Sequence, residues 1–230
     1  MSGRNTIALS RIQKLIGARM LQSKQEKPCF YLESVADVTD FMGMRPSLRK
    51  SLGVKVTTNA FYIRALAAAA ARYPLVAAVP PGPGVCESVV VPRSINVGFA
   101  VNAPQGLVVP VIKQAQGKNL GEIAQLEKTL TELARDNKLS LEQMTGANVA
   151  LSNLGPYDID WFVGIVPPQT STILAVGKVI RTAMPRDGKL VERKTVSLTL
   201  AADHRILEGA YAGRFLSFLA ERLENPAGLL

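Results

Sequence analysis

Histidine and cysteine are nearly absent from this chain of 230 residues, which contains one histidine and two cysteines. Two cysteines cannot build the disulfide framework of a small secreted protein, and Cys29 and Cys86 lack the spacing of metal ligands. We therefore predict no metal centre. No apolar run reaches the roughly 18 residues that a membrane span needs, and no signal or transit peptide is recognisable, so no membrane segment is expected.

Acidic residues are scarce relative to basic ones, which leaves a formal net charge of +9. The lysines and arginines are scattered, without the interleaved aromatic residues or the motifs of a nucleic-acid-binding surface. We therefore expect no nucleic acid partner. Part of the charge is expected to serve an anionic ligand or an acidic partner, and the rest a solvated surface. The hydrophobic fraction of 47% is sufficient for one sizeable core or two small ones.

Hydrophobic periodicity and capping residues predict alternating helices and strands along the chain. Helices are expected over residues 11–20, 40–52, 58–73, 120–137, 140–144 and 209–224. Strands are expected over residues 30–38, 95–101, 106–112, 148–153, 170–179 and 194–200.

Loops and turns connect these elements without a low-complexity linker or an internal repeat. A turn-rich loop is expected at 80–84, and hairpin connections are expected at 102–106 and around 185–188. The nearly all-apolar strands at 95–101 and 106–112 predict burial on both faces. We predict one α+β domain with a mixed, mostly antiparallel sheet and helices packed on one side.

The single histidine, His204, lies between an apolar strand and the start of a helix, in the run Asp203-His204-Arg205-Ile206-Leu207-Glu208-Gly209. Catalytic side chains are commonly held at such junctions, and a neutral imidazole can accept a proton at neutral pH. His204 is thus the candidate general base. From position alone, a structural histidine that stabilises a turn is an equally good interpretation.

Several short motifs, in a fixed order over about 200 residues, resemble one known family. They are Arg11–Met20, Asp37-Val38-Thr39, Asn96–Val101, Gly106–Ile112, Leu151-Ser152-Asn153-Leu154-Gly155, Ile173–Gly177 and Asp203-His204-Arg205. The resemblance is to the catalytic domain of the dihydrolipoyl acyltransferases, the core subunits of 2-oxoacid dehydrogenase complexes. It implies the fold of chloramphenicol acetyltransferase, and it covers essentially the whole chain as one catalytic core domain, residues 1–230.

The resemblance implies transfer of an acyl group, most commonly acetyl, from dihydrolipoamide to the thiol of coenzyme A. His204 matches the family's base, which removes the thiol proton as the thiol attacks. Ser152 matches a hydroxyl that donates to the negatively charged carbonyl oxygen of the tetrahedral intermediate. The alternative for Ser152 is a serine that only satisfies the turn at a strand end.

Two positions depart from the family's pattern. Glu208 stands where the family usually has an aspartate, which is thought to hold the active-site loop through an arginine; Arg11 or Arg19 is the candidate partner. The alternative is that Glu208 caps the last helix, where negative charge is favoured. Cys29 stands where histidine is common, but its apolar flanks indicate an inert thiol rather than a nucleophile.

The family also implies partners. We expect a homotrimer, with His204 of one protomer facing the hydroxyl of its neighbour, and further assembly to a 24-mer or a 60-mer. Leu229 and Leu230 are candidates for the contact between trimers. Lipoyl domains and the other dehydrogenase-complex subunits are expected partners, although no lipoyl or peripheral-subunit-binding module is recognisable in this chain. The expected location is the bacterial cytoplasm or the mitochondrial matrix.

Alternatives to an active core enzyme remain at this point. A catalytically impaired structural subunit of such a complex would share the fold, and Glu208 and Cys29 favour it, whereas His204 and Ser152 favour the enzyme. An antibiotic acetyltransferase would share the fold and the base, but not the motifs at Gly106 and Ser152. The aromatic loop around Tyr157 has two interpretations, an acyl pocket or packing between protomers.

Overall fold

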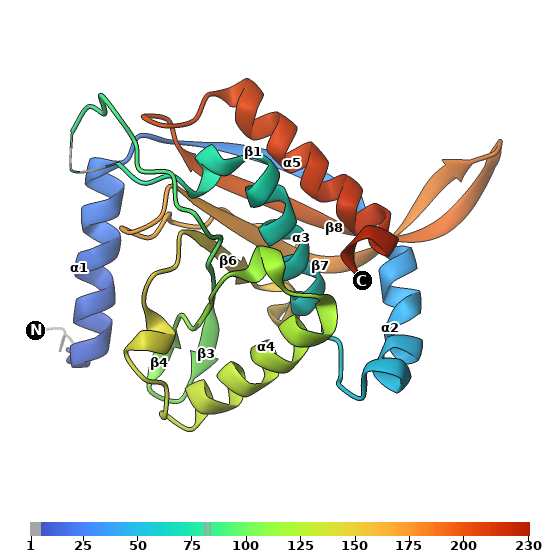
Figure 1. Ribbon diagram of the computed structural model, residues 1–230, viewed down its shortest axis with the longest axis horizontal. Coiled ribbons are helices and arrows are strands. Elements are labelled where there is room, and N and C mark those ends of the chain that lie inside the picture. Colours follow the sequence, from blue (N-terminus) through green and yellow to red (C-terminus); the bar gives the residue numbers. More distant parts are fainter. Residues whose placement is uncertain (1–5, 81, 83) are drawn as a thin grey trace, which may run out of the picture.

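A mixed six-stranded sheet forms the centre of the fold in the computed structural model, which describes residues 6–80, 82 and 84–230 (Figure 1). The strand order is β1-β8-β7-β6-β2-β5. The β7–β6 and β6–β2 pairs are parallel and the other three are antiparallel, which confirms the predicted α+β class. The strands are β1 (Cys29–Asp37), β2 (Val97–Phe99), β5 (Val111–Ile112), β6 (Val149–Asn153), β7 (Thr172–Arg186) and β8 (Lys189–Asp203).

The helices that follow Ser10, Thr57 and Asn119 begin where these capping residues predict. Ser10 and Asn119 form capping boxes, Thr57 caps α3 through its hydroxyl, and Gly53 ends α2 with a positive φ of 65°. The predicted helix at 140–144 is only a 3-10 turn at 142–144. The helices are α1 (Arg11–Glu26), α2 (Thr39–Leu52), α3 (Thr58–Arg72), α4 (Leu120–Arg135) and α5 (Gly209–Glu224).

Helices α3 and α5 cover one face of the sheet, and the main core lies between these helices and the sheet (Figure 1). Val196, Leu198 and Leu200, at alternate positions of β8, belong to this core. The other face is covered over β7 by the segment 158–170. A Cβ at Gly177 would lie 1.8 Å from the Asp160 carbonyl oxygen, so the segment approaches as closely as it does only because Gly177 has no side chain.

The two predicted strands at 95–101 and 106–112 are each divided. Their outer parts, β2 and β5, join the main sheet, and their inner parts, β3 (Val101–Ala103) and β4 (Gly106–Val108), form a separate hairpin. Pro110 lies between β4 and β5 along the chain and has no N–H to donate, so strand pairing is interrupted there. The predicted hairpin connection is confirmed, but Leu107 is 48% exposed, so burial on both faces is wrong for β4.

The hairpin β7–β8 is longer than predicted and projects from the body of the molecule (Figure 1). Its strands continue to a turn at Asp187 and Gly188, whose φ angles of 50° and 76° suit a two-residue hairpin. The apolar pattern stops short of the turn because the end of the hairpin is exposed to solvent, so it could not predict these outer residues.

Three further expectations concern the rim of the fold. Helix α1 extends beyond the predicted residue 20, and its apolar Leu15 is 53% exposed in the single chain. Leu229 is fully buried in the chain's own core, so its expected role between trimers is wrong, whereas Leu230 is 52% exposed. Pro81 and Pro83 of the predicted loop lie outside the described residues.

None of the helices in the described part of the chain is both long and apolar enough to cross a membrane.

Candidate active site

His204 lies immediately after the end of β8, on a turn whose backbone is held from two sides. Its N–H donates to the Pro28 carbonyl oxygen at 3.0 Å, and the N–H of Asp203 donates to the Ser171 carbonyl oxygen at 2.9 Å. The side chain of His204 is exposed, and its ring packs against Phe30 with 4.6 Å between ring centroids. His204 is therefore fixed at its backbone and accessible at its imidazole.

A buried ion pair stabilises the same turn. Asp203 is fully buried, and its Oδ2 lies 2.6 Å from Nη2 of Arg205. Its Oδ1 also accepts from the backbone N–H and from Nε of Arg205, both at 3.0 Å. The hydrogen bonds that its guanidinium group donates to Asp203 raise the pKa of Arg205 above its usual range. The motif Asp203-His204-Arg205 thus places a charged, hydrogen-bonded support on both sides of His204.

Ser152 lies near the end of β6 and lines a pocket of about 430 Å³. The adjacent Asn153 donates through its amide nitrogen to Oδ1 of Asn59 on α3 at 2.9 Å. The Asn153 Oδ1 accepts from the N–H of Gly155, also at 2.9 Å. These bonds connect the strand end to a helix and to the following turn, so Ser152 has a defined direction into the pocket.

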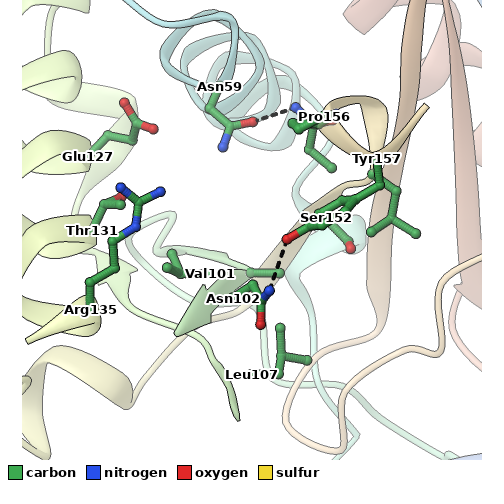
Figure 2. A pocket seen from close by; sticks show the side chains of 13 residues that line it. Asn59, Val101, Asn102, Leu107, Glu127, Thr131, Arg135, Ser152, Pro156 and Tyr157 are labelled. Carbon is green, nitrogen blue, oxygen red and sulfur yellow. Dashed lines mark hydrogen bonds between the residues drawn. The ribbon is translucent and has the colours of Figure 1, made fainter. Parts of the chain in front are cut away.

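The wall opposite Ser152 is polar and comes from one face of α4. Figure 2 shows Glu127, Thr131 and Arg135 along one side of the pocket and Ser152 and Tyr157 along the other. Burial raises the pKa of Glu127, although the Thr57 hydroxyl donates to this carboxylate at 2.9 Å. At the mouth, the amide of Asn102 donates to the Tyr157 hydroxyl at 3.0 Å.

Sequence reasoning missed Asn59 and Glu127 as pocket residues. For Glu127 a signal exists, because it lies on the same helical face as the buried Ile123 and Leu130, where an acidic residue is unexpected. Asn59 carries no comparable signal. Of the aromatic loop, Tyr157 lines the pocket, whereas Trp161 is 57% exposed to solvent.

One chain does not bring His204 and Ser152 together. Ser152 pairs with Ala175 on β7, and Ala175 pairs with Thr199 on β8. His204 follows Thr199 by five residues, so the backbones of Ser152 and His204 are separated by roughly 16 Å along the strand and about 10 Å across two strands. The two side chains cannot contact one carbonyl group from within a single chain.

Glu208 occupies the N-cap position of α5, but its side chain makes no capping hydrogen bond. It is exposed, and no salt bridge among residues 6–80, 82 and 84–230 joins it to Arg11 or Arg19. The proposed arginine partner is therefore not provided within one chain. The exposed carboxylate at a helix N-terminus is still electrostatically favourable.

Cys29 is half-buried and pairs with Asp203 across β1 and β8. Its side chain packs against a small apolar cluster that includes Ala201 and Ile173. Burial, with a smaller effect of Asp203, raises the pKa of the thiol. A thiol that resists ionisation is a poor nucleophile, which agrees with the prediction of an inert cysteine.

Comparison with known proteins places the chain in one family. Residues 2–230 match the family model described as the 2-oxoacid dehydrogenases acyltransferase (catalytic domain). The acetyltransferase component of the pyruvate dehydrogenase complex of Rickettsia felis is 32% identical over 225 residues, which are 96% of this chain and 54% of that protein. The chain thus spans about half the length of the curated relatives it matches.

Solved structures agree with this assignment. The Azotobacter vinelandii dihydrolipoamide acetyltransferase, studied for the role of a serine, a histidine and an asparagine in catalysis, has a TM-score of 0.91 and 28% identity. The cubic core of the pyruvate dehydrogenase multienzyme complex gives the same values, and in both cases the match covers 99% of this chain and 94% of the other.

Chloramphenicol acetyltransferase is more distant. It has a TM-score of 0.54 and 15% identity over 90% of this chain and 92% of that one, and confirms the predicted fold. The fold, the motifs and the family match over nearly all residues lead to one conclusion: this chain belongs to the family of 2-oxoacid dehydrogenase acyltransferase catalytic domains.

Proposed function

We propose that this chain transfers an acyl group, in the first place acetyl, from dihydrolipoamide to coenzyme A. The observation that carries the proposal is the spacing of two side chains in the matched family. In the Azotobacter vinelandii enzyme the serine and the histidine under study are 52 positions apart, as are Ser152 and His204. The acetyl assignment is supported by the names of the Rickettsia felis and Azotobacter vinelandii relatives, which are acetyltransferases.

The reaction needs a base and a hydrogen-bond donor on either side of one thioester carbonyl. We assign the base to His204, which takes the proton of the coenzyme A thiol as the thiol attacks the carbonyl carbon. We assign the donor to Ser152, whose hydroxyl stabilises the negative charge that develops on the carbonyl oxygen. The leaving dihydrolipoamide thiolate recovers a proton from the imidazolium of His204.

The two groups require two copies of the chain. Because the sheet separates Ser152 from His204 within one copy, we propose that His204 of one protomer meets the Ser152 pocket of its neighbour. The exposure of the imidazole supports this, since a neighbouring copy and a substrate can both reach it. When each pocket meets the imidazole of the next copy in a head-to-tail arrangement, the copies close into a ring. A homotrimer is the smallest such ring beyond a dimer.

Glu208 is the third proposed site residue, as a positioning group. In the Azotobacter vinelandii enzyme an asparagine follows the histidine by four positions, as Glu208 follows His204. Asparagine is neutral, so a hydrogen bond rather than a negative charge is the shared feature of this position. We propose that Glu208 accepts such a bond from a neighbouring protomer, with a geometry shifted by its extra methylene group.

The wider setting follows from the same comparison. We propose that residues 1–230 form one catalytic core domain that assembles beyond the trimer, as in the cubic core to which it is similar, to a 24-mer or a 60-mer. Lipoyl domains that deliver the acyl group and the other subunits of a dehydrogenase complex are the proposed partners. The bacterial cytoplasm or the mitochondrial matrix is the proposed location.

The decisive experiment measures thioester formation from acetyl-dihydrolipoamide and coenzyme A, together with molecular mass by light scattering. The expected result is turnover by a trimer or a larger assembly, with kcat reduced about 10²- to 10⁴-fold in His204→Ala. Turnover no higher than that of His204→Ala would leave only the structural-subunit alternative. A monomer with full activity would contradict the shared site.

A further inference from the structure

A ring of hydrogen bonds connects the His204 turn to two other segments. His204 donates its N–H to the Pro28 carbonyl oxygen, and Asp203 donates its N–H to the Ser171 carbonyl oxygen. Lys27, the residue before Pro28, closes the ring. Its Nζ donates to the carbonyl oxygens of residues 167, 168 and 170 at 2.6, 3.0 and 2.6 Å.

The ammonium group of Lys27 matches this environment in number. It has three protons, and three backbone carbonyl oxygens accept them. Lys27 is only 5% exposed, and no salt bridge in the described part of the chain includes it. The end of α1 is attached at the same place, because the Ser23 hydroxyl donates to the Val166 carbonyl oxygen.

Burying this cation is unfavourable in itself. Burial lowers the pKa of Lys27 to about 8. The titratable groups that face it are Asp203 on β8, Cys29 on β1, Glu26 on α1 and Arg205 after β8; the first three oppose the effect of burial and Arg205 adds to it. An apolar side chain would avoid the cost of desolvating a charge, but it would leave the carbonyl oxygens of residues 167, 168 and 170 without this donor.

The segment that Lys27 binds is the one that supports Asp203. Residues 167–170 lead directly to Ser171, whose hydroxyl donates to the Val76 carbonyl oxygen at 2.9 Å while its own carbonyl accepts from Asp203. Displacing this segment would free the backbone of Asp203. Displacing Pro28, which is attached to Lys27, would free that of His204.

We propose that Lys27 is a positioning residue for His204. Its ammonium group holds the segment 167–170 against the residues before β1. The carbonyl groups of Pro28 and Ser171, next to these two segments, then fix the backbone of the Asp203–His204 turn. The consequence for catalysis rests on the proposed function, whereas the effect on the turn does not.

Hydrogen–deuterium exchange of the assembled protein tests the effect on the turn directly. In Lys27→Met, the amides of Asp203 and His204 are expected to exchange about 10-fold faster or more, because three charge-assisted bonds are lost. The matched control is Lys24→Met, in the last turn of α1 just before Lys27, which loses exposed contacts with Tyr31: a hydrogen bond to its hydroxyl and the position of the ammonium group over its ring. Exchange at these amides within twofold of the wild type in Lys27→Met would overturn the proposal.

A second variant separates positioning from folding. Lys27→Arg keeps a cation with several donors and is expected to restore part of the protection that Lys27→Met loses. Amides of α3, away from the ring, serve as the internal reference for global stability. Faster exchange at α3 to the same extent as at Asp203 would mean that Lys27 only stabilises the fold, and would also overturn the proposal.

Kinetics test the link to the reaction. Lys27→Met is expected to lower kcat about 10-fold or more, with KM for coenzyme A within twofold, because a misplaced base affects the chemical step. An unchanged kcat beside faster exchange would overturn the catalytic role of the positioning. If the wild type shows no turnover, the proposed function fails, and the exchange result alone decides whether Lys27 orders the turn.

Discussion

The two halves of the candidate site are held in different ways. The His204 turn depends on buried charge, with the Asp203–Arg205 ion pair beneath it and the ammonium group of Lys27 beside it. The Ser152 strand end depends on hydrogen bonds between neutral amide groups of Asn153, Asn59 and Gly155. The half proposed to move a proton is therefore fixed by strong bonds that are costly to disturb, whereas the half proposed to donate a hydrogen bond forms the wall of an open pocket.

The largest expected effect comes from removing the charge beneath His204. Asp203→Ala leaves the guanidinium group of Arg205, which is 10% exposed, without its partner in a buried site. We expect a loss of about 3–5 kcal/mol in the free energy of unfolding. Denaturant titration at fixed protein concentration measures it, with Asp136→Ala as control, since that carboxylate forms only an exposed pair with Lys138. Equal stability of the two variants would contradict a charge-supported turn.

A change at Ser152 is expected to affect the reaction and leave the fold intact. Ser152→Ala removes the proposed donor to the carbonyl oxygen, and we expect kcat to fall about 10²- to 10³-fold, which corresponds to about 2.7–4 kcal/mol of barrier. The free energy of unfolding is expected to change by less than about 1 kcal/mol, because the serine is half-buried at a strand end. A kcat within a few-fold of the wild type would remove Ser152 from the mechanism.

The sequence predicted most of what places these two residues, for identifiable reasons. The helix starts at Ser10, Thr57 and Asn119 were predictable because each cap is a local interaction. The divided strands around Pro110 were not, because an all-apolar run does not reveal which part pairs with which partner. His204 and Ser152 are proposed as site residues from their motifs, and the variants His204→Ala and Ser152→Ala test that prediction.

The supporting residues could not be predicted in this way. Lys27 binds carbonyl groups about 140 positions away, and Asn59 bonds to a residue 94 positions away. Backbone carbonyl groups leave no mark in a sequence, so a lysine that binds three of them looks like any surface lysine. Neither Arg11 nor Arg19 forms a salt bridge with Glu208 in the described part of the chain, and this too depends on tertiary placement rather than on a local pattern.

The pH dependence of stability provides a comparison within the charged half. The pKa of Lys27 is about 8 in the folded chain and 10.5 for an ordinary lysine. Between these values the unfolded chain keeps a proton that the folded chain has lost, so the free energy of unfolding rises with pH through this window. The full difference corresponds to about 3 kcal/mol.

The measurement is the difference in unfolding free energy between the wild type and Lys27→Met at pH 7.5 and at pH 10. The difference is expected to move in favour of the wild type as pH rises, since only the wild type carries the buried amine. Parallel curves for the two proteins would show that Lys27 keeps an ordinary pKa, and with it that the carbonyl groups offset the cost of burial.

The smallest expected effect is at the neutral bonds of the Ser152 half. Asn59→Ala removes the acceptor for the Asn153 amide at 2.9 Å, and we expect a loss of about 0.5–1.5 kcal/mol in the free energy of unfolding. Because Asn59 also lines the pocket, we expect kcat to fall as well. The fall is expected to be smaller than in Ser152→Ala, because Asn59 is not the proposed donor to the carbonyl oxygen. Asn102→Ala is the matched comparison, since it removes the hydrogen bond from the Asn102 side-chain amide to the Tyr157 hydroxyl at the exposed mouth of the same pocket. A larger loss of stability for Asn102→Ala than for Asn59→Ala would mean that the pocket is held at its mouth rather than at the end of β6. The neutral hydrogen bonds at the end of β6 would then not be what supports the Ser152 half of the site.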